Sequence, residues 1–359
     1  MKAKLILEDG SGIDGKSFGA EKNMAGEVVF STGMTGYPES LTDPSYKGQI
    51  LILTYPLIGN YGVPDKKYWE SDRIQVSGLI VSNYIDTPSH FQSKQTLSQW
   101  LKKENVPALE IADTRFLTQK IRTKGTMLGK IVFKENIKLY DPNKDNLVAR
   151  VSTKKVIEEG KGKKRILLID CGAKRNIKKS LLKRGVKVIT VPWDFDPFSK
   201  SQGAIVNHPG GAIGKFDGIV ISNGPGDPKM ADKTITTIKK ALNKKIPILG
   251  VCLGNQILAL ASGGDTHKLK FGHRSQNQPC ILQDKTKTRC YITTQNHGFA
   301  VNKIPKGFKP WFINANDNTN EGIIHESLPF MSVQFHPEAT PGPVDTEWIF
   351  DYFLEKIKK

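Results

Sequence analysis

The residue of this sequence best placed to do chemistry is Cys252, which lies between two glycines in the run Gly250-Val-Cys-Leu-Gly254. The apolar residues 246–251 before it predict a buried strand, and residues 255–262 after it predict a helix. A thiol at such a strand-to-helix turn is the cysteine form of the nucleophile elbow, where glycines permit a tight turn that exposes the sulfur. The helix N-terminus favours the thiolate and offers N–H groups to an oxyanion. We therefore predict a nucleophile here rather than a buried structural cysteine.

A nucleophilic cysteine needs a base, and His336 is the best candidate among the seven histidines. It follows the β-like residues 332–335, and Glu338 stands two positions later. Glu338 can accept a hydrogen bond from one ring nitrogen and fix the tautomer, which leaves the other nitrogen for Cys252. The remaining cysteines lack surroundings of this kind and are expected to be structural: Cys171, Cys280 and Cys290.

A third feature is the run Ile-Ser-Asn-Gly-Pro-Gly-Asp-Pro at residues 221–228, which ends a predicted strand. Gly224 and Gly226 leave the backbone bare, and the two prolines make it rigid, as an oxyanion or substrate loop requires. An ordinary turn is the alternative interpretation.

The order of the predicted elements divides the chain into two domains joined by a linker. Residues 1–150 hold short β-like runs separated by turn signals, which is typical of a strand-rich α+β domain. The charged residues 151–164 contain two glycines and predict the linker. Strands and helices alternate over residues 165–359, which predicts an α/β domain with a doubly wound, mostly parallel sheet. The site of such a sheet lies at the carboxyl ends of its strands.

Composition indicates a folded chain, because 38% of its 359 residues are hydrophobic and 25% are charged. Four cysteines without a C-x-x-C pair argue against a disulfide framework and against a structural zinc site, so we expect no metal. The apolar runs are too short for a secretory signal or a membrane span. We therefore expect a cytoplasmic protein.

The net charge of +18 is concentrated in one segment, because residues 151–200 carry 14 basic and 5 acidic side chains. Such a segment can attract nucleic acid or an acidic protein partner. Its lysine runs contain no interleaved aromatic residues on which bases could stack. We expect solvated lysine-rich faces first, an acidic protein partner second, and no nucleic acid.

Residues 10–17 match the phosphate-loop pattern G-x-x-x-x-G-K-S. A phosphate-binding loop must open a helix, and Phe18-Gly19-Ala20 is a poor helix start. Glu8 and Asp9 would also repel phosphate. We therefore predict a β-hairpin with a glycine-rich turn and no ATP site.

These segments together resemble a known family. GVCLGNQ, ISNGPGDP, QNHGFAV and QFHPEATPGP are similar to the class I glutamine amidotransferase pattern. TGYPESLTDPSYKGQI and the run DCGAKRNI at 170–177 resemble the small, glutamine-hydrolysing subunit of carbamoyl-phosphate synthetase. The resemblance spans nearly the whole chain, including a first domain that other glutaminases of this class lack.

The resemblance implies roles for individual residues. Cys252 would attack the side-chain amide of L-glutamine, His336 would take the thiol proton and later protonate ammonia, and Glu338 would orient His336. The positions that match the family's glutamine-binding residues are Ser45, Gly224, Gly226, Leu253, Gln256, Asn296, Gly298 and Phe299. The chain departs from the family at Asn255, where His is common, and within residues 271–279.

The resemblance also implies a partner. A large synthetase subunit would receive the ammonia and make carbamoyl phosphate from bicarbonate and two ATP, as a C–N ligase of pyrimidine and arginine biosynthesis. This chain would need no cofactor of its own, because ATP and Mg would bind the large subunit, in a heterodimer or a higher multiple. The alternatives are the glutaminase component of another amidotransferase and a basic protein that binds nucleic acid.

Overall fold

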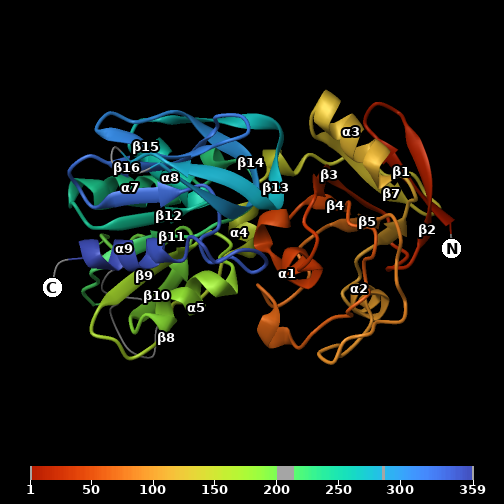
Figure 1. Cartoon of the computed structure of the whole chain (residues 1–359), viewed down its shortest axis with the longest axis horizontal. Helices are drawn as coiled ribbons and strands as arrows, with labels where there is room; N and C mark the ends of the chain where they lie inside the picture. Colours follow the sequence, from red (N-terminus) through yellow and green to blue (C-terminus); the bar gives the residue numbers. More distant parts are fainter. Residues whose placement is uncertain (1, 200–213, 285–287, 358–359) are drawn as a thin grey trace. The chain divides into compact units, whose positions relative to one another are not determined.

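The computed structural model describes residues 2–199, 214–284 and 288–357 (Figure 1). The chain forms two compact units, one of residues 1–145 with 270–276 and one of residues 146–269 with 277–359.

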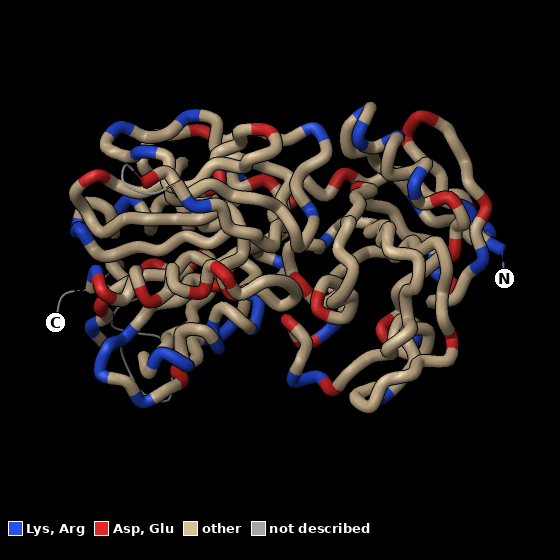
Figure 2. Tube along the Cα trace, viewed as in Figure 1, with Lys and Arg blue, Asp and Glu red and all other residues tan. Residues whose placement is uncertain are grey.

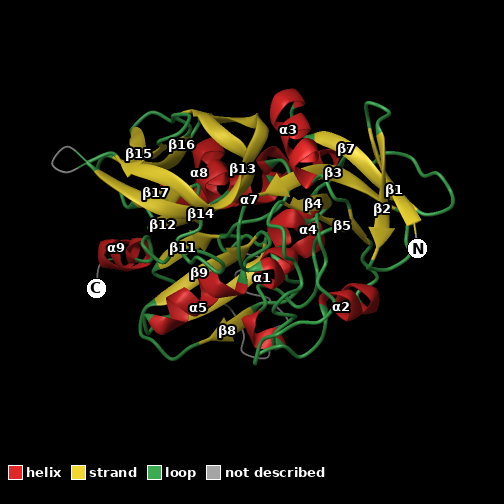
Figure 3. Cartoon of the chain, turned by 45° about the vertical axis from the view of Figure 1, so that its right-hand side comes forward, coloured by secondary structure: helices red, strands yellow, loops and turns green. Residues whose placement is uncertain are grey.

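The first unit is built around a closed barrel of strands in the order β1-β2-β6-β5-β4-β3-β7. Figure 3 shows β1, β2, β3 and β7 as neighbouring arrows, and the pairing of β1 with β7 closes the ring. Its strands are β1 (Lys2–Leu7), β2 (Gly12–Ser17), β3 (Met24–Ser31), β4 (Gln49–Leu53), β5 (Gly78–Val81), β6 (Ala108–Glu110) and β7 (Met127–Val132). Its helices are α1 (Tyr37–Thr42), α2 (Leu97–Lys103) and α3 (Thr114–Lys124), with short 3₁₀ turns η1 (Pro44–Tyr46), η2 (Lys66–Tyr68) and η3 (Pro142–Lys144). The strand-rich α+β character is as predicted.

Strands β4 and β5 are buried on both faces, so their side chains feed two apolar clusters. One cluster joins alternate strand residues to Leu41 of α1 and Trp100 of α2. The other joins the opposite strand face to Leu117 and Ile121 of α3. This double burial explains why β4 and β5 read as continuous apolar runs rather than as alternating patterns.

The segment that imitates a phosphate loop is a hairpin, as predicted. Strand β2 pairs antiparallel with β1, and Lys16 faces Lys2 across the ladder. Because residues 12–17 are a strand and open no helix, the structural context of a phosphate-binding loop is not met.

The second unit is organised by a ten-stranded sheet, in the order β14-β13-β15-β16-β17-β12-β11-β9-β10-β8 among the described residues. Its strands are β8 (Ile157–Glu159), β9 (Arg165–Asp170), β10 (Lys187–Pro192), β11 (Gly218–Ile221), β12 (Ile248–Val251), β13 (Asp265–Leu282), β14 (Arg289–Lys303), β15 (Phe308–Asn314), β16 (Asn320–His325) and β17 (Phe330–Val333). Its helices are α4 (Leu147–Val151), α5 (Arg175–Lys183), α7 (Asp232–Asn243), α8 (Leu253–Ala261) and α9 (Trp348–Lys356), with the 3₁₀ turn η4 (Pro228–Met230). The run β10-β9-β11-β12-β17 is parallel, and the strands β16, β15 and β13 continue it antiparallel.

Helices cover both faces of the parallel strands, which confirms the doubly wound prediction. Ile166 and Leu168 of β9 pack with α5 and α9, while Leu167 and Ile169 pack with α7 and α8. Figure 1 shows the same sandwich, with α7 and α8 on one side of β11 and β12 and with α5 and α9 on the other. The alternation of buried strand residues between two helical layers fixes the register of the sheet.

The domain boundaries differ from the expected ones. Contacts divide the chain after Asp145 rather than after residue 150, because helix α4 packs within the second unit. Residues 151–164, expected to be a linker, contain strand β8, which pairs antiparallel with β10. The pattern of β8 misled the prediction because an edge strand of three largely exposed residues carries no apolar signal.

Several basic side chains of residues 151–199 form ion pairs within the second unit, and Figure 2 colours the charged positions along the trace. Glu158 contacts Arg165 at 3.3 Å and Lys187 at 3.5 Å. Glu159 contacts Lys178 at 2.5 Å. The side chains of these pairs are partly exposed, as on a solvated lysine-rich face.

Candidate active site

Four parallel strands of the second unit deliver polar segments to one edge of the sheet. The residues that follow β9, β11, β12 and β17 begin at Cys171, Ser222, Cys252 and Gln334. Because these strands run in the same direction, their carboxyl ends meet at this edge. The predicted nucleophile and the predicted base therefore leave adjacent strands, β12 and β17.

Cys252 occupies the strained turn expected of a nucleophile elbow. It is the N-cap of α8 and has φ 54° and ψ −102°, a conformation that a residue with a side chain rarely adopts. The glycines on either side are needed for packing. A Cβ on Gly250 would collide with the carbonyl of Gly254, and a Cβ on Gly254 would collide with the carbonyl of Ile221.

The sulfur of Cys252 lies in a polar, enclosed place, because the residue is 2% exposed. Its Sγ lies 3.7 Å from the carbonyl oxygen of Asn296, to which the thiol donates. The Nε2 amide of Gln334 donates to the sulfur, also at 3.7 Å. The first turn of α8 begins at Leu253, where backbone N–H groups have no partner inside the helix.

His336 and Glu338 form the predicted pair. The Nδ1 of His336 lies 2.7 Å from Oε1 of Glu338, and both side chains are buried. Burial alone would lower the pKa of His336, but Glu338 and the sulfur of Cys252 outweigh it and raise the pKa to about 10. Among the described residues, no group other than the Cys252 thiol interacts with Nε2. This nitrogen is therefore available to exchange a proton with the nearby thiol.

Lys174 completes this arrangement, and the sequence analysis did not single it out. Its ammonium lies 3.1 Å from Oε1 of Glu338 and donates to the carbonyl of Ala339 at 2.5 Å. Burial alone would raise the pKa of Glu338, but Lys174 and His336 outweigh it and lower the pKa to about 2. The signal was present, because Lys174 stands in the run DCGAKRNI directly after β9, at the carboxyl edge of the sheet.

The glycine loop after β11 lies against the elbow. A Cβ on Gly224 would come within 2.7 Å of the Leu253 side chain and would collide with the carbonyl of Cys171. Gly226 has φ 82°, which favours glycine, and packs beside Leu147. The loop is thus bare backbone held close to the first turn of α8.

Five of the predicted glutamine-binding residues lie on α8 and β14: Leu253, Gln256, Asn296, Gly298 and Phe299. Asn296, Gly298 and Phe299 belong to β14, and Gln256 of α8 donates from Nε2 to the carbonyl of Phe299 at 2.7 Å. Asn296 is joined to this group through its carbonyl contact with Cys252. Ser45 lies in the first unit, in η1, where its N–H donates to Asp43, and its place at the site stays a prediction.

The other two buried cysteines differ from Cys252 in their surroundings. Burial raises the pKa of Cys171, and burial together with Glu321 raises that of Cys280. Both thiols therefore stay protonated near neutral pH. Cys290 is exposed, and all four cysteines are free.

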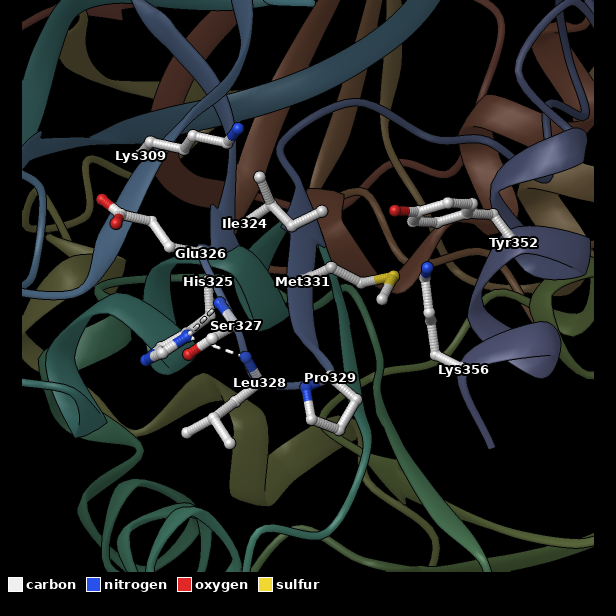
Figure 4. A pocket seen from close by; sticks show the side chains of 10 residues that line it. All are labelled: Lys309, Ile324, His325, Glu326, Ser327, Leu328, Pro329, Met331, Tyr352 and Lys356. Carbon is white, nitrogen blue, oxygen red and sulfur yellow. Dashed lines mark hydrogen bonds between the residues drawn. The ribbon is translucent and has the colours of Figure 1, made fainter. Parts of the chain in front are cut away.

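A pocket of 370 Å³ lies at the opposite edge of the sheet, where β16 turns into β17 (Figure 4). Ile324 and Met331 form its floor, with Lys309 and Lys356 on opposite sides in this view. Its wall is shaped by His325, whose Nδ1 accepts the backbone N–H groups of Ser327 and Leu328. Because no predicted site residue lines this pocket, it is separate from the Cys252 edge.

Comparison with known families agrees with this geometry. Residues 167–356 match the family model "Glutamine amidotransferase class-I". The chain belongs to the class I glutamine amidotransferases. Residues 5–131 of this amidotransferase match "Carbamoyl-phosphate synthase small chain, CPSase domain".

Curated relatives match this amidotransferase over nearly its whole length. It is 48% identical over 99% of the chain to the human "Carbamoyl-phosphate synthase [ammonia], mitochondrial". It is 49% identical over 98% of the chain to "Multifunctional protein CAD" of Squalus acanthias, and 46% identical over 99% to "Multifunctional protein pyr1-3" of Dictyostelium discoideum. The chain spans only 24%, 16% and 17% of the lengths of these three relatives.

None of the helices in residues 2–199, 214–284 and 288–357 combines the length and the apolar character that a bilayer crossing requires.

Proposed function

We propose that this amidotransferase hydrolyses L-glutamine to glutamate and ammonia through a thioester on Cys252. The observation that carries the proposal is the geometry at the carboxyl edge of the sheet. Cys252, which has a strained backbone conformation, lies close enough to His336 for its sulfur to raise the pKa of the imidazole. Nδ1 of His336 lies 2.7 Å from Glu338, which leaves Nε2 for the thiol. These are the nucleophile, base and orienting group of a catalytic triad.

His336 takes the proton of the Cys252 thiol before substrate binds, because its raised pKa of about 10 keeps that proton on the imidazole at neutral pH, and the sulfur then attacks the side-chain amide carbon of glutamine. The tetrahedral oxyanion accepts hydrogen bonds from the backbone N–H groups of Leu253 and Gly226. His336 then gives its proton to the departing nitrogen, and ammonia leaves a γ-glutamyl thioester. Water, activated by the same imidazole, attacks the thioester, and glutamate leaves with the thiol restored.

Glutamine recognition rests on matched positions around the sulfur. Gln256 lies one helical turn after Cys252, and we assign it to the polar groups of the substrate together with β14. The full proposed set is Ser45, Gly224, Gly226, Leu253, Gln256, Asn296, Gly298 and Phe299. Ser45 is included on its motif alone.

We further propose that the ammonia is used for carbamoyl phosphate. The match of residues 5–131 to the carbamoyl-phosphate synthase small-chain domain and the names of the relatives support this assignment. The chain then serves a large synthetase subunit that binds bicarbonate, ATP and Mg, in pyrimidine and arginine biosynthesis. This chain itself needs no cofactor, because a cysteine thiolate supplies the nucleophile, and it acts in the cytoplasm.

A second candidate function is support of ammonia-dependent synthesis without glutamine hydrolysis, because the names of several relatives specify ammonia. Family membership alone therefore does not decide whether glutamine is hydrolysed. Cys252 with its His336–Glu338 pair favours hydrolysis, because a chain that only supported ammonia-dependent synthesis would need no nucleophile at this turn.

The test is glutamate release from glutamine by the purified chain, alone and with a large synthetase subunit, ATP and bicarbonate. We expect slow hydrolysis alone, a sharp rise with the partner, and complete loss in Cys252→Ala. Cys290→Ala is the matched control, because Cys290 is exposed and should leave the rate unchanged. Hydrolysis that survives Cys252→Ala, or that is absent even with the partner, would refute the proposal.

A further inference from the structure

Behind Cys252 lies a chain of buried polar side chains that the triad does not use. Ser332, Asn255 and Gln334 are each fully buried, and Gln256 is 2% exposed. Buried polar side chains are costly unless their hydrogen bonds are satisfied, so the way these groups pair is informative. The pairs connect strand β17 to the first turn of α8 and end at the sulfur.

The hydrogen bonds of this chain run in one direction. Ser332 Oγ donates to Oδ1 of Asn255 at 2.8 Å, so the Nδ2 amide of Asn255 faces the other way. That Nδ2 donates to Oε1 of Gln334 at 3.0 Å. The Nε2 of Gln334 is then directed to the sulfur of Cys252, at 3.7 Å.

A second contact fixes the same orientation. Gln256 Nε2 donates to Oε1 of Gln334 at 3.1 Å and to the carbonyl of Phe299 at 2.7 Å. A carbonyl only accepts, so Nε2 of Gln256 is a donor and Oε1 of Gln334 is an acceptor. With two donors on its oxygen, the Gln334 amide cannot flip without losing both bonds.

We propose that Gln334 stabilises the Cys252 thiolate by donating its Nε2–H to the sulfur, with the sense of the donation set by Asn255 and Ser332. An N–H aimed at a charged acceptor favours the ionised form more than the neutral form. The inference rests on the proposed function, because it concerns the same nucleophile. It also gives a role to Asn255, where the sequence departs from the family pattern. Asn255 accepts a hydrogen bond from Ser332 and donates one to Gln334.

The test measures the ionisation of Cys252 directly. The full chain is alkylated with iodoacetamide over a range of pH without glutamine, and the modification of Cys252 is followed by peptide mass spectrometry. Gln334→Met keeps the size of the side chain and removes the N–H. We expect the midpoint of the alkylation profile to move up by about one pH unit, with about tenfold slower modification near neutral pH. The rates should converge at high pH, where every thiol is ionised.

Matched variants separate this role from a merely structural one. Gln295→Met removes a buried amide that donates to the sulfur of Cys280 at 3.2 Å, and it should leave the midpoint of Cys252 unchanged. Ser332→Ala removes the hydroxyl that donates to Asn255, which is the hydrogen bond farthest from the sulfur. It should move the midpoint upward by less than Gln334→Met does. If Gln334→Met fails to fold, Ser332→Ala alone decides the matter.

A midpoint that stays at the wild-type value in both Gln334→Met and Ser332→Ala would overturn the inference. Glutamine hydrolysis retained in such variants would leave the proposed function standing. Hydrolysis retained in Cys252→Ala would remove the proposed function instead, so the two failures are distinguishable.

Discussion

Among the residues that the structure describes, the buried pairs His336–Glu338 and His297–Glu321 of the second unit differ in the hydrogen bonds that the histidine nitrogens make. His336 uses Nδ1 for Glu338 at 2.7 Å, and Nε2 remains available beside Cys252. His297 uses Nδ1 for the carbonyl of Phe299 at 2.9 Å. Its Nε2 lies 3.3 Å from Oε1 of Gln295 and 3.8 Å from Glu321.

The comparison teaches that a buried histidine–carboxylate pair is not by itself catalytic. Both nitrogens of His297 are engaged with acceptors, so this ring has no nitrogen left to take a proton from a substrate or a thiol. His336 has one engaged nitrogen and one available nitrogen, which is the arrangement a general base requires. The sequence separation differs, because His336 and Glu338 are two residues apart while His297 and Glu321 are far apart. That separation does not state which ring nitrogens are engaged in hydrogen bonds.

The largest expected effect comes from removing the available nitrogen. His336→Asn should lower kcat for glutamine hydrolysis by ~10³-fold or more, because the variant has no group to move the proton. Steady-state glutamate release measures this loss. An activity within tenfold of wild type would break the distinction between the two pairs.

The next effect concerns Lys174, whose ammonium lies 3.1 Å from Glu338 of the His336 pair. Lys174→Met removes the ammonium that balances the negative charge of the buried Glu338 carboxylate. It should lower the free energy of unfolding by about 3–5 kcal/mol. Urea denaturation measures the change. Lys183→Met is the control, because the side chain of Lys183 is 72% exposed and its loss should change stability by less than about 0.5 kcal/mol. Equal stability of the two variants would show that the buried pair does not depend on Lys174.

His297 should affect binding more than chemistry. His297→Asn loses the hydrogen bond to Phe299, whose carbonyl also receives Gln256, so the residues assigned to glutamine recognition lose an anchor. We expect KM for glutamine to rise by about tenfold, which is about 1.4 kcal/mol, while kcat stays within a few-fold. A loss of kcat as large as that of His336→Asn, with an unchanged KM, would contradict the assignment.

The smallest expected effect is a dependence of stability on pH. The pKa of Glu338 falls from its ordinary 4.5 to about 2, so its contribution is present above pH 4.5 and is lost as pH falls toward 2. The pKa of His336 rises from 6.5 to about 10, so its contribution is present below pH 6.5 and is lost as pH rises toward 10. The pair should therefore stabilise the fold most between about pH 4.5 and 6.5.

The measurement is Tm against pH for wild type and for the charge-neutral variant Glu338→Gln with His336→Asn. The difference between the two curves should be largest inside that window and should shrink on both sides. A difference that is flat from pH 4 to 10 would mean that the pair has ordinary pKa values in the folded chain.

Local patterns made part of the site predictable. The geometry of Cys252 follows from its two flanking glycines, and that of the His336–Glu338 pair follows from a separation of two residues. Both patterns are visible within short runs of sequence. The contacts of Lys174 with Glu338 and of Gln334 with Cys252 could not be predicted in this way, because each joins residues more than 80 positions apart in the sequence. Their contacts depend on which strands become neighbours, and the sequence pattern does not state strand order.

The same limit applies to the fold. The alternation of strands and helices after Arg165 predicts parallel strands, because a crossover helix joins each pair. Closure of the barrel in the first unit could not be predicted, because it depends on the pairing of β1 with β7, which are far apart in the sequence. The antiparallel arrangement of strands β13 to β16 could not be predicted either, because no crossover helix separates these strands among the described residues. Strand β8 was missed because its three residues are largely exposed at an edge of the sheet.

The most direct test of the central claim is to trap the covalent intermediate. The full chain is mixed with glutamine, quenched in acid within the first turnover, digested, and analysed by mass spectrometry. The account predicts a γ-glutamyl group on the peptide that contains Cys252, and none in Cys252→Ala. Glutamate released at the wild-type rate by Cys252→Ala, or a γ-glutamyl group on another residue, would contradict it.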